Sequence, residues 1–463
     1  MKRIKIGLLP LYIELYDESF SDCRPRMDAF YSEIAEELRQ RELDVLTVPI
    51  CRRKSEFAAA IGTFEKAQAE GLVTLHLAYS PSLESAAALA ATALPILVLD
   101  TTPTYDFGPR QDPAEIMFNH GIHGVQDMCN LLLRNGKPYR IEAGHWKESD
   151  VLERVALWAR SARLAGAMRA ARVGRIGEPF EGMGDFAVEP DELDRTLGVE
   201  TVPCDMQGMR RLVAKVTDAE VEAEMAENAK RCAAQKLKPE VHRRSVRAGL
   251  AVRRWIEKEA LTAFTVNFLA IDKACGLPTV PFLEASQAMA RGIGYAGEGD
   301  VLTAALVGTL ASVFPDTTFT EMFCPDWKGN RIFLSHMGEV NIRLLEGKPL
   351  LVEYPFPFTD ADNPARAVGL LRGGRAVFVN LAPIGPQRYR LIVAPVAMTG
   401  VNGTDRMGES VHGWFKPRMA IGEFLSAYSR AGGTHHAALV YGDCARELAA
   451  FGDLMRWDTT VIE

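Results

Sequence analysis

Two glutamates and a set of histidines in the C-terminal half of the chain have the residue types of a metal-assisted active site. Glu298 stands between two glycines in GEGDVLTAAL, and Glu321 lies among aromatic residues in FTEMFCPDW. His336 belongs to IFLSHMGEV, and His435 and His436 form a pair in AGGTHHAALVY. Carboxylates and imidazoles together suit a divalent cation with open positions for a ligand, such as Mn²⁺. A closed structural zinc site would favour cysteine.

The two acids on either side of Gly299 require different explanations. Asp300 directly precedes an apolar, helix-like run, so it is predicted to cap the first turn of that helix. Glu298 lies outside the helix and has no capping position. A loop acid pointing to solvent is the alternative to a functional role for Glu298 and for Glu321, because burying an unpaired carboxylate is costly.

The histidines also have a structural alternative. His336 would share a strand face with Ile332 and Leu334, where a lone imidazole can be an ordinary core residue. Adjacent strand residues face opposite sides of a sheet, so at most one of His435 and His436 should point into any single site. Both faces of the run that follows are apolar, so alternation leaves the choice between the two histidines open.

The spacing of these residues matches no local metal motif. Glu298 and Glu321 are 23 residues apart, Glu321 and His336 are 15 apart, and His336 and His436 are 100 apart. Only the fold can bring them into one site.

Composition excludes several other classes of function. The 463 residues carry 53 Lys and Arg against 60 Asp and Glu, a net charge of −7, and no basic stripe that would follow a nucleic acid backbone. The longest apolar stretches are rich in alanine and broken by Pro95, so we expect no membrane span. The eight cysteines are scattered without a CxxC pair, and no signal peptide leads the chain, which predicts a cytoplasmic protein.

The N-terminal part, residues 1–170, alternates short β-branched runs with helical patterns, which is typical of a doubly wound parallel sheet. IGLLPLY stands where a dinucleotide-binding GxGxxG would follow the first strand, so a dinucleotide role has little support. Glycines and a proline in ARVGRIGEPFEGMGDF then punctuate the chain, and residues 171–316 form a second predicted α/β domain.

From residue 317 to 463 the pattern changes to short strands closed by turns. One predicted hairpin turns at EGKP and a second turns at GPQR, and both imply antiparallel pairing. We therefore predict two doubly wound α/β domains followed by a β-rich antiparallel C-terminal domain, built as a sandwich or a barrel.

Seven segments in the same order resemble the L-arabinose isomerases, within the group that also includes the L-fucose isomerases. The segments are HGIHGVQDM, GHWKESDVLERVALW, GYAGEGDVLTAAL, FTEMF, LSHMGEV, DNPARA and AGGTHH. They lie between about residues 117 and 440, and the family's fold agrees with the three predicted domains.

The resemblance assigns roles to individual residues. It implies that Glu298, Glu321, His336 and His436 bind the metal and that Glu298 and Glu321 are the catalytic carboxylates, with Glu321 as the base at C2. It selects His436 where alternation does not. It also implies that His123 contacts the sugar in an active site shared between subunits of a homo-oligomer, often a hexamer.

The implied function is a metal-dependent aldose-ketose isomerase acting on a free pentose or related small sugar through a cis-enediol intermediate. One carboxylate takes the C2 proton and the other acts as acid, while the cation stabilises charge on the sugar oxygens. An epimerase with the same enediolate, or a non-catalytic sugar-binding protein, is the alternative. Leu9-Pro10 replaces the family's Gln-His pair and Val301-Leu302 replaces Trp-Lys, so the sugar is left open.

Overall fold

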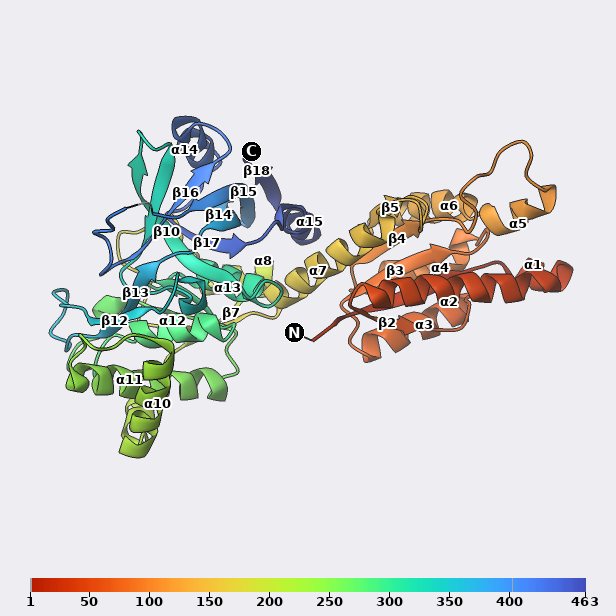
Figure 1. Ribbon diagram of the computed structural model, residues 1–463. Helices are drawn as coiled ribbons and strands as arrows, with labels where there is room; N and C mark the ends of the chain where they lie inside the picture. Colours follow the sequence, from red (N-terminus) through yellow and green to blue (C-terminus); the bar gives the residue numbers. More distant parts are fainter. Residues whose placement is uncertain (1, 402) are drawn as a thin grey trace. The chain divides into compact units, whose positions relative to one another are not determined.

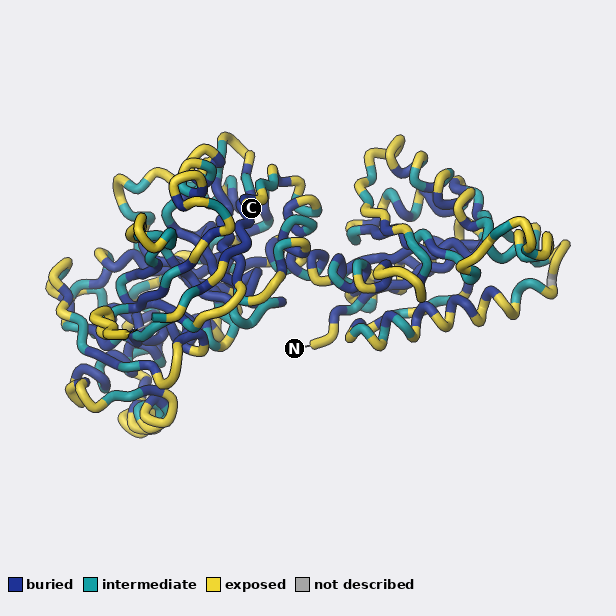
Figure 2. The backbone as a smooth tube through the Cα atoms, turned by 45° about the horizontal axis from the view of Figure 1, so that its top comes forward, coloured by how far each residue is buried: buried dark blue, intermediate teal, exposed yellow. Residues whose placement is uncertain are grey.

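A computed structural model describes residues 2–401 and 403–463, which form two compact units. The first unit comprises Met1–Gly166 and the second Ala167–Glu463. In each unit, buried strands lie beneath helices whose outer faces are exposed (Figure 2). No helix in the described ranges is both long and apolar enough to cross a membrane.

The first unit is a five-stranded parallel sheet with strand order β2-β1-β3-β4-β5 (Figure 1). Its strands are β1 (Ile4–Leu11), β2 (Leu43–Thr47), β3 (Gly71–His76), β4 (Ile96–Asp100) and β5 (Arg140–Ala143). Its helices are α1 (Glu14–Ser19), α2 (Arg24–Gln40), α3 (Lys54–Lys66), α4 (Ser82–Ala91), α5 (Ile116–Asn119) and α6 (Ile122–Arg134), with α7 (Val151–Arg169) crossing into the second unit. Close packing fixes helix against strand: a Cβ on Gly7 would lie 2.5 Å from the ring of Phe64.

The second unit begins with a four-stranded parallel sheet of order β7-β6-β8-β9. The strands are β6 (Arg172–Ile176), β7 (Glu200–Pro203), β8 (Ala263–Val266) and β9 (Gly294–Gly297). The helices are α8 (Pro190–Leu197), α9 (Met206–Ala214), α10 (Asp218–Arg231), α11 (Pro239–Lys258), α12 (Phe282–Ala290) and α13 (Val301–Ala311). α9 and α10 are separate helices, because Thr217 caps the start of α10 with a capping box to Glu220.

Six antiparallel strands of the C-terminal part close into a barrel, because β16 pairs with both β11 and β15. The full set is β10 (Thr317–Asp326), β11 (Arg331–Ser335), β12 (Leu350–Glu353), β13 (Ala365–Leu370), β14 (Gly374–Gly385), β15 (Arg388–Thr399), β16 (Val411–Pro417), β17 (His436–Tyr441) and β18 (Asp458–Val461), with helices α14 (Ile421–Arg430) and α15 (Ala445–Met455). Around the closed ring the order is β16-β11-β10-β17-β14-β15. Leu334, Phe378, Ile392 and Phe415 belong to its buried core.

One of the two predicted hairpins is correct and the other is wrong. β14 and β15 pair across the GPQR turn as expected. Across EGKP, however, no hairpin forms, because β11 pairs with β10 and β16 while β12 pairs with β13. β11 ends at Ser335, and the residues after it form a loop that is followed by a short 3-10 helix (Ile342–Leu344).

The fold class is confirmed: two parallel α/β sheets precede a β-rich, antiparallel C-terminal part. Every residue of α13 is buried, because the helix contacts β8 and β9 of the central sheet and also β10 and β17 of the barrel. This helix therefore holds the end of β9 beside the barrel. Within the second unit we keep 171–316 and 317–463 as our proposal for the domain boundaries, with 1–170 before them.

Candidate active site

Glu298 occupies the carboxyl end of β9, in a backbone conformation that few side chains adopt. Its φ is 64°, in the left-handed region, which costs a non-glycine residue roughly 1–2 kcal/mol. Its N–H donates to the carbonyl of Val266 at 2.8 Å, and its carbonyl accepts from the N–H of Phe180 at 2.9 Å. The residue is 8 % exposed, so it is not a loop acid pointing to solvent.

Asp300 has two partners, one for each carboxylate oxygen. Oδ1 accepts from the N–H of Thr303 at 2.8 Å, which confirms the predicted helix cap. Oδ2 accepts from Nδ1 of His436 at 2.9 Å, and neither side chain is exposed. The cap of α13 therefore also fixes the orientation of a histidine 136 residues away.

Strand register brings the other acid and the histidines together. Glu321 on β10 lies opposite His436 at the start of β17 and opposite Ser335 at the end of β11. His336 follows Ser335 directly, so both imidazoles lie next to the Glu321 carboxylate. Three adjacent strands of one barrel thus supply three of the four residues that the sequence singled out.

His336 is held in the same way as His436. Its Nδ1 donates to Oε2 of Glu339 at 2.8 Å, and that oxygen also accepts from the N–H of Gly338. The other oxygen of Glu339 accepts from the hydroxyl of Tyr295 at 2.9 Å. Each histidine therefore directs Nδ1 to a buried carboxylate, which leaves Nε2 to face the other acids.

The Nε2 atoms converge with the two glutamates. Nε2 of His436 lies 3.3 Å from Oε2 of Glu298, and Nε2 of His336 lies 3.8 Å from Oε2 of Glu321. Ligand atoms of Glu321, His336 and His436 lie within 4.8 Å of one another. Although Oε2 of Glu298 lies 3.3 Å away, the buried Nε2 of His436 makes no hydrogen bond of acceptable geometry within residues 2–401 and 403–463. Imidazole nitrogens together with carboxylate oxygens form a set of ligand atoms that suits a divalent cation.

His435 also approaches this cluster, which the alternation argument did not expect. Its Nε2 lies 3.7 Å from Oε2 of Glu298, while its Nδ1 and its backbone N–H donate to Oδ2 of Asp185 at 2.7 and 2.9 Å. The argument fails because β17 begins at His436, so His435 is not yet in extended pairing. Glu298, His435 and His436 form a second group whose ligand atoms lie within 4.8 Å of one another.

Two phenylalanines enclose the histidines. Phe319 places its ring edge-on to His336 and His436, with centroid distances of 4.8 and 5.0 Å. Phe186 stacks on His436 at 5.1 Å with an interplanar angle of 16°. These apolar rings lower the local dielectric beside the two imidazoles, which strengthens their electrostatic interactions with the carboxylates.

The acids and imidazoles shift one another's pKa. Burial opposes ionisation of Glu298, but the imidazoles of His435 and His436 outweigh burial and lower its pKa. Burial raises the pKa of Glu321. Burial would lower the pKa of His436, but Asp300 and Glu298 outweigh it and raise that pKa to about 10. The cluster thus strongly favours positive charge, either a proton or a cation.

His123 lies in the first unit, on α6, and its side chain is exposed. Its predicted contact with sugar in a shared site stays a prediction. The departures from the family pattern are buried: Leu9 is fully buried in the core of the first unit, and Val301 and Leu302 are 6 % and 1 % exposed.

Sequence reasoning missed Glu339 and Asp185. Glu339 had a signal, since an acid three residues after a candidate ligand in HMGE can reach back to it. Asp185 had none, because it lies 250 residues from His435 in sequence. The sequence correctly predicts Asp300 as a helix cap but gives no sign of its second role, which is to accept from Nδ1 of His436.

Comparisons with known proteins agree with this architecture. A family model for the L-arabinose isomerase central domain matches residues 183–314, and one for the C-terminal domain matches residues 316–458. An L-arabinose isomerase of Nocardioides is 28 % identical over 385 residues, covering 80 % of this chain and 75 % of the relative. One of Shouchella clausii is 25 % identical over 473 residues, covering 99 % of this chain and 93 % of the relative. The chain therefore belongs to the L-arabinose isomerase family and is a sugar isomerase, an intramolecular oxidoreductase.

Proposed function

We propose that the chain is a divalent-metal-dependent aldose-ketose isomerase that acts on a free pentose or related small sugar through a cis-enediol. L-arabinose, the sugar in the names of its relatives, is the first substrate to test. The observation that carries the proposal is the paired arrangement of His336 and His436. Each is anchored at Nδ1 by a buried carboxylate and presents Nε2 to Glu298 or Glu321.

We assign Glu298, Glu321, His336 and His436 as the residues that hold the cation, with Mn²⁺ as the expected ion. Two carboxylates and two imidazoles leave positions open for sugar oxygens on a six-coordinate ion. The unpartnered Nε2 of His436 supports this fit, because a buried imidazole nitrogen without a partner costs free energy. His435, held by Asp185, stands at the edge of the same cluster.

Glu298 and Glu321 would move the proton. When bound, the cation supplies Lewis-acid stabilisation of negative charge on the sugar oxygens. Glu321 acts as the base at C2 and Glu298 as its partner acid, and the two exchange roles in the reverse reaction. The Phe319 and Phe186 rings flank the imidazoles and lower the local dielectric, which strengthens these electrostatic effects.

Asp300 and Glu339 are positioning residues in this proposal. Each accepts Nδ1–H from one histidine and so fixes the tautomer that presents a lone pair at Nε2. Asp300 does so from the first turn of the buried helix α13, and Glu339 from a loop that is itself bonded to Tyr295. The ligand geometry thus rests on the central sheet as much as on the barrel.

We further propose a homo-oligomer, with a hexamer as the expected form, in which His123 reaches the active site of a neighbouring copy. Exposed apolar side chains of the first unit, some of them close to this histidine in sequence, support an interface there. They include Phe20, Tyr105, Phe107, Ile116 and Ile122, which are 38 to 69 % exposed. The segment that contains Phe20 contacts the segment between Ile116 and Ile122, because the hydroxyl of Tyr16 lies 3.1 Å from Nε2 of His120. Light scattering of the purified protein tests the assembly, and a monomer would contradict it.

The eight cysteines are all free thiols, which supports our proposal of a cytoplasmic protein.

The decisive experiment incubates purified protein, loaded with Mn²⁺, with a panel of tetroses, pentoses and hexoses. We expect interconversion of at least one aldose and its ketose, and we expect chelation or Glu321→Gln to abolish it. Glu423→Gln, an exposed acid on α14, is the matched control and should retain activity. Bound metal without turnover of any sugar in the panel would refute the proposal and favour a sugar-binding protein.

Turnover in deuterated water separates an isomerase from an epimerase. Isomerisation places deuterium at C1 of the ketose, whereas epimerisation places it at C2 of an aldose. NMR of the product therefore decides between the two uses of the same enediolate.

A further inference from the structure

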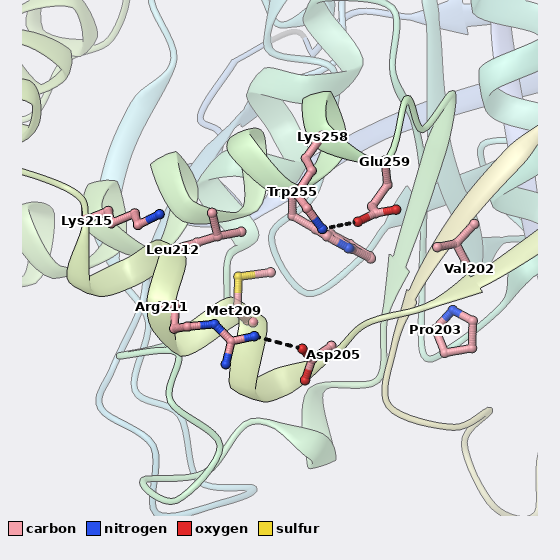
Figure 3. Close-up of a pocket in the computed structure, with 11 residues that line it drawn as sticks. Val202, Pro203, Asp205, Met209, Arg211, Leu212, Lys215, Trp255, Lys258 and Glu259 are labelled. Atoms are coloured by element: carbon pink, nitrogen blue, oxygen red, sulfur yellow. Dashed lines mark hydrogen bonds and ion pairs between the residues drawn. The ribbon is translucent and has the colours of Figure 1, made fainter.

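Three surface cavities of the second unit lie away from the active site, and they differ in how their positive charges are balanced. The first, of about 300 Å³, lies between β7, α9 and the end of α11 (Figure 3). In it Arg211 pairs with Asp205 at 3.2 Å, and Lys258 pairs with Glu259 at 2.5 Å. Its floor is apolar, with Trp255 and Met209 among the side chains that form it.

The second cavity, of about 210 Å³, lies at the ends of β14, β15 and β16. Both of its arginines have an acid beside them: Arg375 lies 3.5 Å from Asp443, and Arg418 lies 3.4 Å from Glu463. Neither of these two cavities therefore presents an arginine without a counter-charge.

The third cavity, of about 350 Å³, does contain arginines without a counter-charge, and we call it the arginine pocket. It is defined by Arg195, Gln387, Arg388, Tyr389, Arg456 and Trp457. Arg388 pairs with Asp458 at 3.0 Å. Arg195 and Arg456 have no ion pair or hydrogen bond from their guanidinium groups within residues 2–401 and 403–463.

Arg195 and Arg456 are exposed residues whose backbones belong to ordered elements. Arg195 belongs to the last turn of α8, and Arg456 ends α15 in the left-handed conformation. The β14–β15 hairpin docks on α8 through Glu192, which accepts from the N–H of Gln387 at 2.9 Å and from the hydroxyl of Tyr389 at 3.4 Å. The pocket therefore joins a helix of the central part to a hairpin and a helix end of the C-terminal part.

The surroundings add to the positive charge. Arg169, whose Nη2 donates to the carbonyl of Leu454, lies close to Arg456, and burial together with this like charge lowers the pKa of Arg169. The pocket also contains the side-chain amide of Gln387 and the indole of Trp457, both able to donate. Asp458, the one carboxylate among the lining residues that the structure describes, already pairs with Arg388 and Arg390, and the nearby Glu192 is occupied by Gln387 and Tyr389. The groups left over are donors, and a fitting ligand must supply acceptors and negative charge.

We propose that the arginine pocket binds a small phosphate-bearing molecule, either inorganic phosphate or a phosphate monoester. A phosphate carries close to two negative charges at neutral pH and three acceptor oxygens, which match two unpaired guanidinium groups. The volume lies at the low end of the range for ligand sites, so a molecule of a few heavy atoms beyond the phosphate fits. This site is separate from the sugar site and does not depend on its assignment.

Calorimetric titration of the metal-loaded protein with inorganic phosphate and with glycerol phosphate tests the proposal. We expect one site per chain at millimolar ligand or below. The double variant R195Q/R456Q should bind at least roughly tenfold more weakly, because two charge-assisted contacts are lost. Tighter binding of glycerol phosphate identifies a monoester as the ligand, and tighter binding of inorganic phosphate identifies the free ion.

The control is R375Q/R418Q, which removes the same charge from the second cavity, whose arginines already have acids beside them. It should bind phosphate within about twofold of the wild type, and both double variants should keep their sugar isomerase activity and melting temperature without phosphate. Absence of binding to the wild type overturns the proposal. So does equal binding by R195Q/R456Q, which would put the phosphate elsewhere.

Discussion

His76 in the first unit and His436 in the second are both buried at the end of a strand, yet their surroundings have opposite effects. His76 closes β3 and is 3 % exposed, and neither of its ring nitrogens has a hydrogen-bond partner in the part of the chain that the structure describes. Burial lowers its pKa to about 3. His436 opens β17 and is not exposed at all, but Asp300 and Glu298 raise its pKa to about 10.

The difference shows what separates a ligand from a core histidine. Burial alone favours the neutral imidazole and gives it no orientation. A carboxylate on Nδ1 fixes the ring, and acids facing Nε2 create the field that attracts a cation. His336 meets both conditions through Glu339 and Glu321, whereas His76 meets neither.

The same substitution at both positions gives the largest expected contrast. His436→Leu should lower isomerase activity and bound metal by more than about 100-fold, because losing a direct ligand exceeds the 10- to 100-fold effect of losing an outer partner. His76→Leu should keep activity within about threefold, because its ring lies in the core of the first unit. Turnover rates and metal content per chain measure both. A folded His436→Leu protein that retains its metal would contradict the assignment.

A smaller effect is expected from Asp300→Asn. Asparagine still caps α13, since it accepts from the N–H of Thr303, but it no longer offers His436 a charged acceptor. Metal affinity should fall roughly 10- to 100-fold with little change in melting temperature.

Asp205→Asn is the matched control, because Asp205 caps α9 in the same way without contacting a histidine. Metal titration of the two variants separates capping from positioning. Equal affinity in both would show that the carboxylate charge of Asp300 does not matter to the metal.

Much of the fold could be predicted from the sequence because local patterns determine it. Strand and helix periods in the first 170 residues and the turn at GPQR depend on neighbours only a few residues away. The failure at EGKP is instructive, since residues 336–345 alternate like a strand. Their conformation depends on distant partners: Ser286 donates to the carbonyl of Gly338 and accepts from the N–H of Val340.

The candidate site was predictable by residue type but not by contact. Residue type alone does not decide whether Glu298 and Glu321 are functional carboxylates or loop acids that point to solvent. The family resemblance is what favours the functional role. The bond from His436 to Asp300 spans 136 residues and depends on α13 packing between a sheet and a barrel. No short-range pattern encodes such a contact, and the resemblance named the four expected ligands but not the carboxylates that orient the histidines.

The smallest expected effect is on stability at acid pH and concerns His76. Its folded-state pKa of about 3 lies below the unfolded value of roughly 6.5, so the folded protein holds this ring neutral. The stability is fully present above pH 6.5 and is lost as pH falls towards 3, because the unfolded chain binds the proton first. Between pH 7 and pH 5.5 this histidine should cost about 1 kcal/mol of unfolding free energy.

The His76→Leu variant lacks this pH-dependent contribution. Its free energy of unfolding should therefore fall less between pH 7 and pH 5.5 than that of the wild type. Chemical denaturation of both proteins at the two pH values gives the difference directly, and other titrating groups cancel between them. At pH 7 the variant should be at least as stable, since two unpartnered ring nitrogens leave the core. An unchanged slope would mean that His76 gains a partner or takes up a proton in the folded state. The difference between His76 and His436 would then come only from the carboxylates around His436, and not from the burial of His76.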